Sequence, residues 1–120
     1  MLRLVCKSKI HRATVTEVDL DYEGSITIDD NLLREANILP NEIVLVANLS
    51  NGERFETYVM KGKAGSGIVA LNGAAARLGM PGDKVIIISS VLMDDDEASI
   101  YKPIVVRVDE KNKILKDERR

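Results

Sequence analysis

Short runs of aliphatic and β-branched residues, separated by polar turns, dominate the chain. Residues 2–8 and 12–18 are rich in such residues, with the polar stretch 9–11 between them, and SITI (25–28) follows the turn DYEGS. Runs of this kind favour strands over helices. The first 28 residues are therefore predicted to form three short strands.

A short helix is expected next, over NLLREAN (31–37). Asp29 or Asp30 can cap its N-terminus, and Asn37 can end it in the left-handed conformation. The helix would be about two turns long.

Strand patterns return after the helix. EIVLVANL (42–49) and ERFETYVMK (53–61) flank Asn51-Gly52, which is a type I′ hairpin signal. In the second of these strands Phe55, Thr57 and Val59 alternate with Arg54, Glu56 and Tyr58, so that Arg54 and Tyr58 share one face.

The second half of the chain continues in the same way. A glycine-rich loop (62–67) leads to the strand 68–72, one or two helical turns at 73–78, the turn GMPGD, and KVIIISSVLM (84–93), which is predicted to be a strand buried on both faces. A last strand at 104–108 precedes a charged tail.

An internal repeat connects the two halves. ILPNEIVLVAN recurs 41 residues later as GMPGDKVIIIS, pairing Pro40 with Pro81 and Val44 with Val85. Two copies are too few for a solenoid but suit a small closed barrel with approximate two-fold symmetry. We therefore expect a mainly β fold with short helices, in a single domain over residues 1–120.

Composition narrows the function classes. Hydrophobic residues make up 45% but aromatic residues only 3%, so the core must be aliphatic. The net charge of −2 has the wrong sign for binding nucleic acid through its phosphates. Cys6 is the single cysteine, and the N-terminus shows neither a signal sequence nor a membrane span, so we expect a cytoplasmic protein without membrane association.

Gly24-Ser25 is a candidate for self-cleavage. A serine hydroxyl can attack the preceding carbonyl to form an ester, if the backbone is distorted and the oxyanion is stabilised. The ester can then eliminate to dehydroalanine, which hydrolyses to a pyruvoyl group. Gly-Ser is also ordinary turn material, so the dipeptide by itself decides nothing.

Other polar residues also have purely structural explanations. Lys9 and Arg54 suit solvated charges, His11 a surface or loop residue, and Tyr58 a packing residue that could also act as an acid. Asn72-Gly73 opens a strand-to-helix turn that is either a connector or a holder of a carboxylate through its N–H groups.

Taken together, the blocks KIHRATVTEVDLDYEGSITID, NGERFETYV and LNGAAARLGMPGDKVIIIS resemble the pyruvoyl-dependent aspartate 1-decarboxylases over nearly the full length. The resemblance implies a double-psi β-barrel and a homotetramer with active sites shared between subunits. It also implies autocatalytic cleavage into chains 1–24 and 25–120, and decarboxylation of L-aspartate to β-alanine and CO2 for pantothenate and coenzyme A biosynthesis.

The same resemblance implies roles for individual residues and no metal. Ser25 would become the pyruvoyl cofactor that forms a Schiff base with substrate, and Tyr58 would be the proton donor. The implied substrate-binding residues are Thr57, Gly73, Ala74, Ala75, Arg54, Lys9, His11 and Asn72, and Thr57 is also implied in promoting self-cleavage. A difficulty is that Thr57 should face away from Tyr58, which would require a twist, a bulge or a site shared between subunits.

Two other classes stay open on sequence. One is a non-catalytic barrel that binds a ligand or regulates transcription, and the other is an uncleaved relative that keeps the fold without the chemistry. Intact-mass measurement would separate them from the enzyme.

Overall fold

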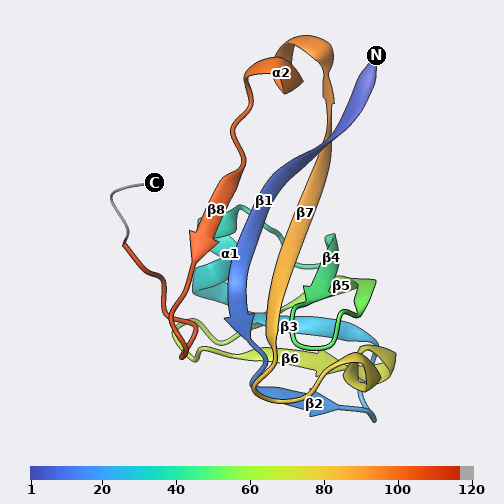
Figure 1. The fold of residues 1–120 in the computed structure, drawn as a ribbon, viewed down its shortest axis with the longest axis vertical. Coiled ribbons are helices and arrows are strands. Elements are labelled where there is room, and N and C mark those ends of the chain that lie inside the picture. The colour runs from blue at the N-terminus through green and yellow to red at the C-terminus, as the bar shows by residue number, and fades with distance from the viewer. Residues whose placement is uncertain (117–120) are drawn as a thin grey trace.

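The computed structural model describes residues 1–116 and consists mainly of strands (Figure 1). The strands are β1 (Leu2–Thr14), β2 (Glu17–Asp19), β3 (Ser25–Asp29), β4 (Ile43–Asn48), β5 (Arg54–Gly62), β6 (Val69–Asn72), β7 (Lys84–Asp94) and β8 (Ile104–Arg107). The helices are α1 (Asp30–Ala36), the 3₁₀ helix η1 (Gly73–Leu78) and α2 (Asp95–Ile100).

The strands form a mixed sheet that closes on itself. Its order is β2-β6-β3-β5-β4-β7-β1-β8. The chain runs directly from β1, beside β7, into β2, beside β6. At this junction Val15 N–H donates to Asp83 O and Thr16 N–H donates to Val69 O, at 2.9 and 2.8 Å. The β1/β2 segment therefore joins β7 to β6 and leaves no open edge between them.

The ring has the two-fold symmetry that the repeat predicts. Val46 of β4 pairs with Ile87 of β7, and these two residues are equivalent positions of the repeat. The pairings of β1/β2 with β6 and of β5 with β3 are both parallel, and those of β1 with β7 and of β5 with β4 are both antiparallel. This mainly β arrangement is compatible with the double-psi β-barrel.

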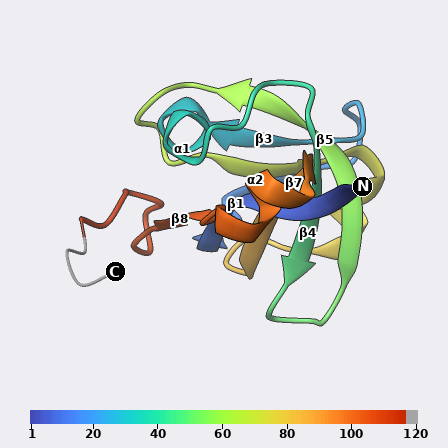
Figure 2. The same cartoon turned by 90° about the horizontal axis from the view of Figure 1, so that it is seen from above.

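Aliphatic side chains fill the barrel, as the composition predicts. The largest fully buried side chains come from β1, β3, α1, β4, β5, β6 and β7: Ile10, Ile26, Ile28, Leu32, Leu33, Val44, Val46, Val59, Val69, Leu71 and Ile87. Figure 2 shows the strands of the ring from above, with α1 at its rim. Burial of such side chains is the main favourable term in the stability of a fold of this size.

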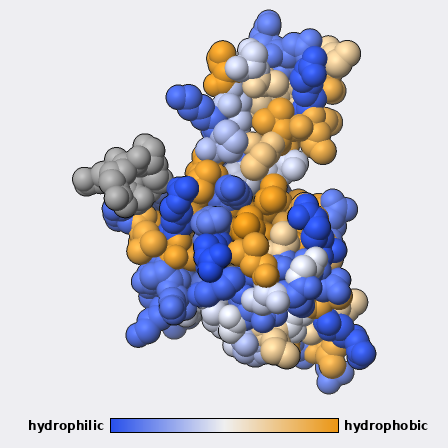
Figure 3. All heavy atoms as spheres, viewed as in Figure 1, coloured by the Kyte–Doolittle hydropathy of each residue, from blue (hydrophilic) through white to orange (hydrophobic). Residues whose placement is uncertain are grey.

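The first half of β1 and the second half of β7 leave the barrel as a two-stranded ribbon, which ends at α2 (Figure 1). Leu4, Leu92 and Ile100 are 73%, 59% and 81% exposed there. Figure 3 shows hydrophobic side chains gathered on this projecting part and below it. In residues 1–116 no helix is both long and apolar enough to cross a membrane.

The short helix α1 confirms the prediction from its caps. The Asp29 carboxylate accepts a hydrogen bond from Asn31 N–H, and Asn37 ends the helix at φ 57°. The same carboxylate accepts hydrogen bonds from Gly65 N–H and Gly67 N–H, at 3.0 and 2.7 Å. Asp29 thus also fixes the glycine-rich loop to the helix.

The predicted break at residues 9–11 is wrong, because β1 runs without interruption from Leu2 to Thr14. Ile10 pairs with Ile87 and Ala13 with Val85, so β1 carries one extra residue at a β-bulge. Arg12 takes a positive φ of 63° there. A bulge accommodates the extra residue at the polar His11-Arg12 pair, and the strand continues beyond it.

Three local expectations need correction. Gly52 has a positive φ but Asn51 does not, so the β4–β5 hairpin is not a type I′ turn; Gly52 N–H instead donates to Asn48 O. β7 is not buried on both faces: buried and half-buried residues alternate from Lys84 to Ser89, and no residue from Ser90 to Asp94, the half that lies in the ribbon, is buried. The helix α2 was not expected, although Asp94 and Glu97 form an N-terminal cap signal, with Asp94 accepting from Glu97 N–H.

Candidate active site

Ser25 is fully buried at the first position of β3, although residues 16–24 before it are exposed. It pairs with Asn72, the last residue of β6. Asn72 Nδ2 donates to Ser25 Oγ at 3.0 Å and to Thr27 Oγ1 at 2.9 Å. Ser25 Oγ in turn donates to Glu23 O at 2.9 Å. The hydroxyl is therefore held against the backbone that precedes it.

The turn after β6 lies in close contact with the backbone that precedes Ser25. Gly73 has φ 63°, and a Cβ at this position would lie 2.6 Å from both Gly24 Cα and Gly24 N and 2.8 Å from Tyr22 O. No side chain fits in that space, so the contact requires glycine at 73. Gly24 itself has open space around a Cβ position, and its φ is not in the left-handed region. The constraint on the Gly24-Ser25 bond thus comes from Gly73.

Tyr58 lies on the β5 strand beside β3. Its hydroxyl donates to Glu23 Oε1 in a long hydrogen bond of 3.5 Å. Partial burial raises the pKa of Tyr58 above 10.0, and the negative charge of Glu23 raises this pKa further. The phenol therefore stays protonated at neutral pH, next to the residue that precedes Gly24.

Thr57 faces the other way, as regular alternation predicts. It pairs with the buried Val44, whereas Tyr58 pairs with Ile43, which is 61% exposed. The ladder between β4 and β5 shows no irregularity at these positions, so no bulge brings both side chains to one face. Arg54 is exposed at the start of β5, four residues or about 13 Å along the strand from Tyr58.

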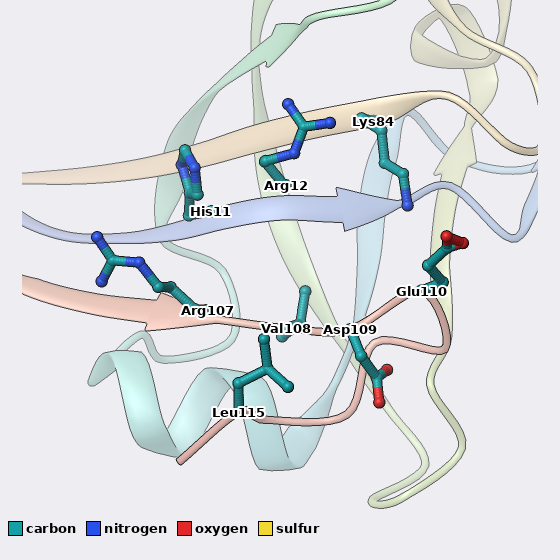
Figure 4. A pocket seen from close by; sticks show the side chains of 8 residues that line it. All are labelled: His11, Arg12, Lys84, Arg107, Val108, Asp109, Glu110 and Leu115. Atoms are coloured by element: carbon teal, nitrogen blue, oxygen red, sulfur yellow. The ribbon is translucent and has the colours of Figure 1, made fainter. Parts of the chain in front are cut away.

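Lys9 and His11 lie on β1, which is adjacent to β7 and β8 rather than to β3. The bulge turns His11 and Arg12 toward one cavity of about 300 Å³, shared with Arg107, Lys84 and residues of the segment after β8 (Figure 4). Partial burial lowers the pKa of His11, and the charges of Lys9, Arg107 and Arg12 lower this pKa further. His11 is therefore neutral at pH 7.

Within residues 1–116 no hydrogen bond joins Lys9, His11 or Arg54 to Ser25. Among the described residues, the Nδ1 atom of His11 is buried without a hydrogen-bond partner. One subunit thus brings together Ser25, Gly24, Asn72, Gly73 and Tyr58, but not the three cationic or imidazole side chains expected at the site.

The turn that opens η1 is in place beside Ser25. Gly73 and Ala75 are buried and Ala74 is exposed. Nothing in residues 1–116 groups three or more His, Cys, Asp or Glu side chains in a way that could hold a metal ion. The site therefore offers a serine, an amide, a phenol and backbone N–H groups.

Two residues at the site were not expected from the sequence. Glu23 contributes its carbonyl to Ser25 and its carboxylate to Tyr58. Met60 Sδ lies 3.1 Å from Ser25 Oγ and is a second acceptor within reach of its one proton. Strand alternation could have found Met60, because it lies two residues after Tyr58 on the same face of β5.

Comparison with known proteins identifies the family. A family profile described as aspartate decarboxylase matches residues 1–115. A protein of Pelotomaculum thermopropionicum named aspartate 1-decarboxylase is 63% identical over 115 residues, covering 96% of this chain and 87% of its own length. Proteins with the same name from Thermoanaerobacter pseudethanolicus and Kosmotoga olearia are 59% and 62% identical, covering 94% and 93% of this chain and 97% and 96% of their own. The chain belongs to the aspartate decarboxylase family.

Proposed function

We propose that the protein is a pyruvoyl-dependent aspartate 1-decarboxylase, which cleaves its own chain between Gly24 and Ser25 and converts L-aspartate to β-alanine and CO2. The observation that carries this proposal is the buried Ser25 hydroxyl, which Asn72 and the Glu23 carbonyl hold beside a backbone that Gly73 constrains. A serine with only a structural role needs no such close approach of a positive-φ glycine.

The cleavage begins with attack of Ser25 Oγ on the carbonyl carbon of Gly24. The C–N bond breaks, the hydroxyl proton passes to the released amine, and an ester links the two residues. Removal of the Cα proton of Ser25 then expels the Gly24 carboxylate and leaves dehydroalanine, whose hydrolysis releases ammonia and gives a pyruvoyl group. Asn72 donates to one lone pair of Oγ and leaves the other for the attack.

The residues around Ser25 fit a pyruvoyl group at the new N-terminus. The position is fully buried beside the carboxamide donor of Asn72, and the protonated phenol of Tyr58 lies against Glu23, two residues before it. A pyruvoyl group there would supply an electrophilic carbonyl for the substrate amine and an acceptor for the electrons of the bond that breaks. In this proposal Tyr58 delivers a proton to the former α-carbon, a role for which a positioned acid contributes roughly 10²- to 10⁴-fold.

The substrate carboxylates require cationic or N–H hydrogen-bond donors, and within the described part of one subunit no cationic side chain is hydrogen-bonded to Ser25. The guanidinium of Arg54 can bind a carboxylate through two parallel hydrogen bonds. The N–H groups of the turn from Asn72 to Ala75 are a second candidate. We include Thr57, Lys9 and His11 as further substrate-binding residues contributed across an interface.

The enzyme would be a homotetramer with shared active sites. The separation of Arg54, Lys9 and His11 from Ser25 supports this, because a second subunit can supply what one chain leaves apart. The exposed leucines and isoleucine of the β1–β7 ribbon and α2 also support it, since large apolar surfaces are normally covered in an assembly. The lone cysteine is consistent with function in the reducing cytoplasm.

Product analysis tests the activity. The purified protein is incubated with L-aspartate and with L-glutamate, and β-alanine and CO2 are quantified. We expect β-alanine from the natural chain and none from Ser25→Ala, which lacks the nucleophile. A natural chain that is fully cleaved but forms no β-alanine would refute the proposed reaction.

Mixing subunits tests the shared site. Ser25→Ala and Arg54→Ala chains, each inactive alone, are expressed together with different affinity tags, and the mixed oligomer is purified. If Ser25 and Arg54 of one site come from different subunits, some mixed sites hold both natural residues and activity returns. A mixed oligomer that stays inactive would place both residues of a site in the same subunit.

A further inference from the structure

Met60 is the one side chain of β5 that is within hydrogen-bond distance of the Ser25 hydroxyl. Its Sδ atom lies 3.1 Å from Ser25 Oγ, and Met60 pairs with Thr27 in the parallel ladder between β5 and β3. We propose that Met60 is a positioning residue for self-cleavage, with its thioether acting as a weak acceptor that orients the Ser25 hydroxyl. This inference rests on the proposed cleavage at Gly24-Ser25.

The hydroxyl has one proton and two acceptors to choose from. Glu23 O lies at 2.9 Å and Met60 Sδ at 3.1 Å, while Asn72 Nδ2 donates to the oxygen at 3.0 Å. A carbonyl oxygen is a good acceptor, whereas a thioether sulfur is a weak one. The two acceptors define the direction of the proton and hence the direction of the free lone pair.

The role of Met60 is limited to orientation. In the cleavage step the proton leaves Oγ and ends on the Ser25 nitrogen, and a thioether does not hold a proton at neutral pH. Met60 is also only partly buried, whereas Ser25 is fully buried. A stronger acceptor in its place would compete with the transfer, and an aliphatic group would leave the hydroxyl with Glu23 O alone.

The expected effect is moderate. The net contribution of one hydrogen bond corresponds to roughly 2- to 10-fold in an equilibrium or rate, and a sulfur acceptor belongs in the lower part of that range. Loss of the sulfur without loss of volume should therefore slow self-cleavage by roughly 2- to 5-fold. Loss of packing would instead act through stability of the fold.

Atom replacement at sulfur separates these two effects. In a chain carrying Met80→Leu and Met93→Leu, Met60 is the remaining methionine apart from Met1, which is 85% exposed. This chain is made by cell-free synthesis with methionine, selenomethionine or norleucine. Selenium keeps the acceptor, whereas the methylene of norleucine keeps only the shape. The rate of appearance of the two fragments is followed by intact mass, and thermal unfolding is measured in parallel.

We expect the norleucine chain to cleave roughly 2- to 5-fold more slowly than the methionine chain and the selenomethionine chain to cleave at the methionine rate. Equal rates for methionine and norleucine would overturn the role of Met60, as would equal slowing by norleucine and selenomethionine. A methionine chain that stays full-length would instead refute self-cleavage, and with it the role of Met60.

Discussion

The contact between Gly73 and Gly24 makes a strong prediction about Gly73→Ala. Alanine at φ 63° costs about 1–2 kcal/mol. The new Cβ would lie 2.6 Å from the Gly24 backbone, and overpacking of this kind costs about 1–3 kcal/mol. The sum of about 2–5 kcal/mol is less than the stability of a typical domain, so most of the protein should stay folded.

The larger effect should fall on cleavage. To reach ordinary van der Waals distance, the Tyr22–Gly24 backbone has to move by about 0.8 Å away from Gly73, and a shift of this order at a reacting bond can cost about 100-fold in rate. Ser25 Oγ would keep its bond from Asn72 while its target carbonyl moves. We therefore expect cleavage of Gly73→Ala to be slowed about 100-fold.

Gly52→Ala is the matched control. Gly52 also has a positive φ, of 80°, but a Cβ there meets nothing within 4 Å. It should lose about 1–2 kcal/mol of stability and cleave at the natural rate. Cleavage is followed by intact mass and stability by urea unfolding. If Gly73→Ala cleaves as fast as Gly52→Ala, the Gly73 contact does not control the scissile bond.

Four other changes test separate parts of the site and fold. Tyr58→Phe should still cleave but decarboxylate roughly 10²- to 10⁴-fold more slowly, and near-normal β-alanine formation would assign the proton donor elsewhere. Arg54→Lys should leave cleavage intact and lower kcat/KM for L-aspartate by about 10-fold, and unchanged kinetics would exclude Arg54 as the carboxylate anchor. Burial and the charge of Glu23 raise the pKa of Tyr58, so that its protonated form persists above pH 10.0. Glu23→Gln removes this charge and should move the alkaline fall of activity to lower pH. An unmoved pH profile would show that Glu23 does not act on Tyr58. Asp29→Ala removes a buried acceptor of three N–H groups and should cost about 2–4 kcal/mol in urea unfolding. Asp30→Ala, which loses an ion pair with the exposed side chain of Arg34, should cost about 0–1 kcal/mol; equal losses would contradict the loop-anchoring role of Asp29.

The elements that the sequence predicts well are those with local signals. Asp29 and Asn37 mark the ends of α1 because capping depends on residues adjacent in the chain. The repeat predicts the symmetry of the barrel because the pairing of Val46 with Ile87 relates equivalent positions of the two halves.

Other features depend on contacts between distant residues and have no local signal. The bulge at His11 and Arg12 is set by the register of β1 against β7, so the sequence shows only a polar stretch that resembles a break between strands. The close approach of Gly73 to Gly24 follows from the position of the β6–η1 turn over the end of the 20–24 segment. The separation of Lys9 and His11 from Ser25 depends on strand order, which their sequence positions do not reveal. Arg54 lies on β5, the neighbour of β3, and is separated along the strand instead.

The intact mass of the purified protein tests self-cleavage most directly. We predict two fragments, residues 1–24 with a normal carboxyl end and residues 25–120 with a mass lower by one ammonia than a fragment beginning with unmodified serine. Ser25→Ala, purified in the same way, should give a single full-length species. A natural chain that remains full-length under conditions in which it is folded would contradict the central claim.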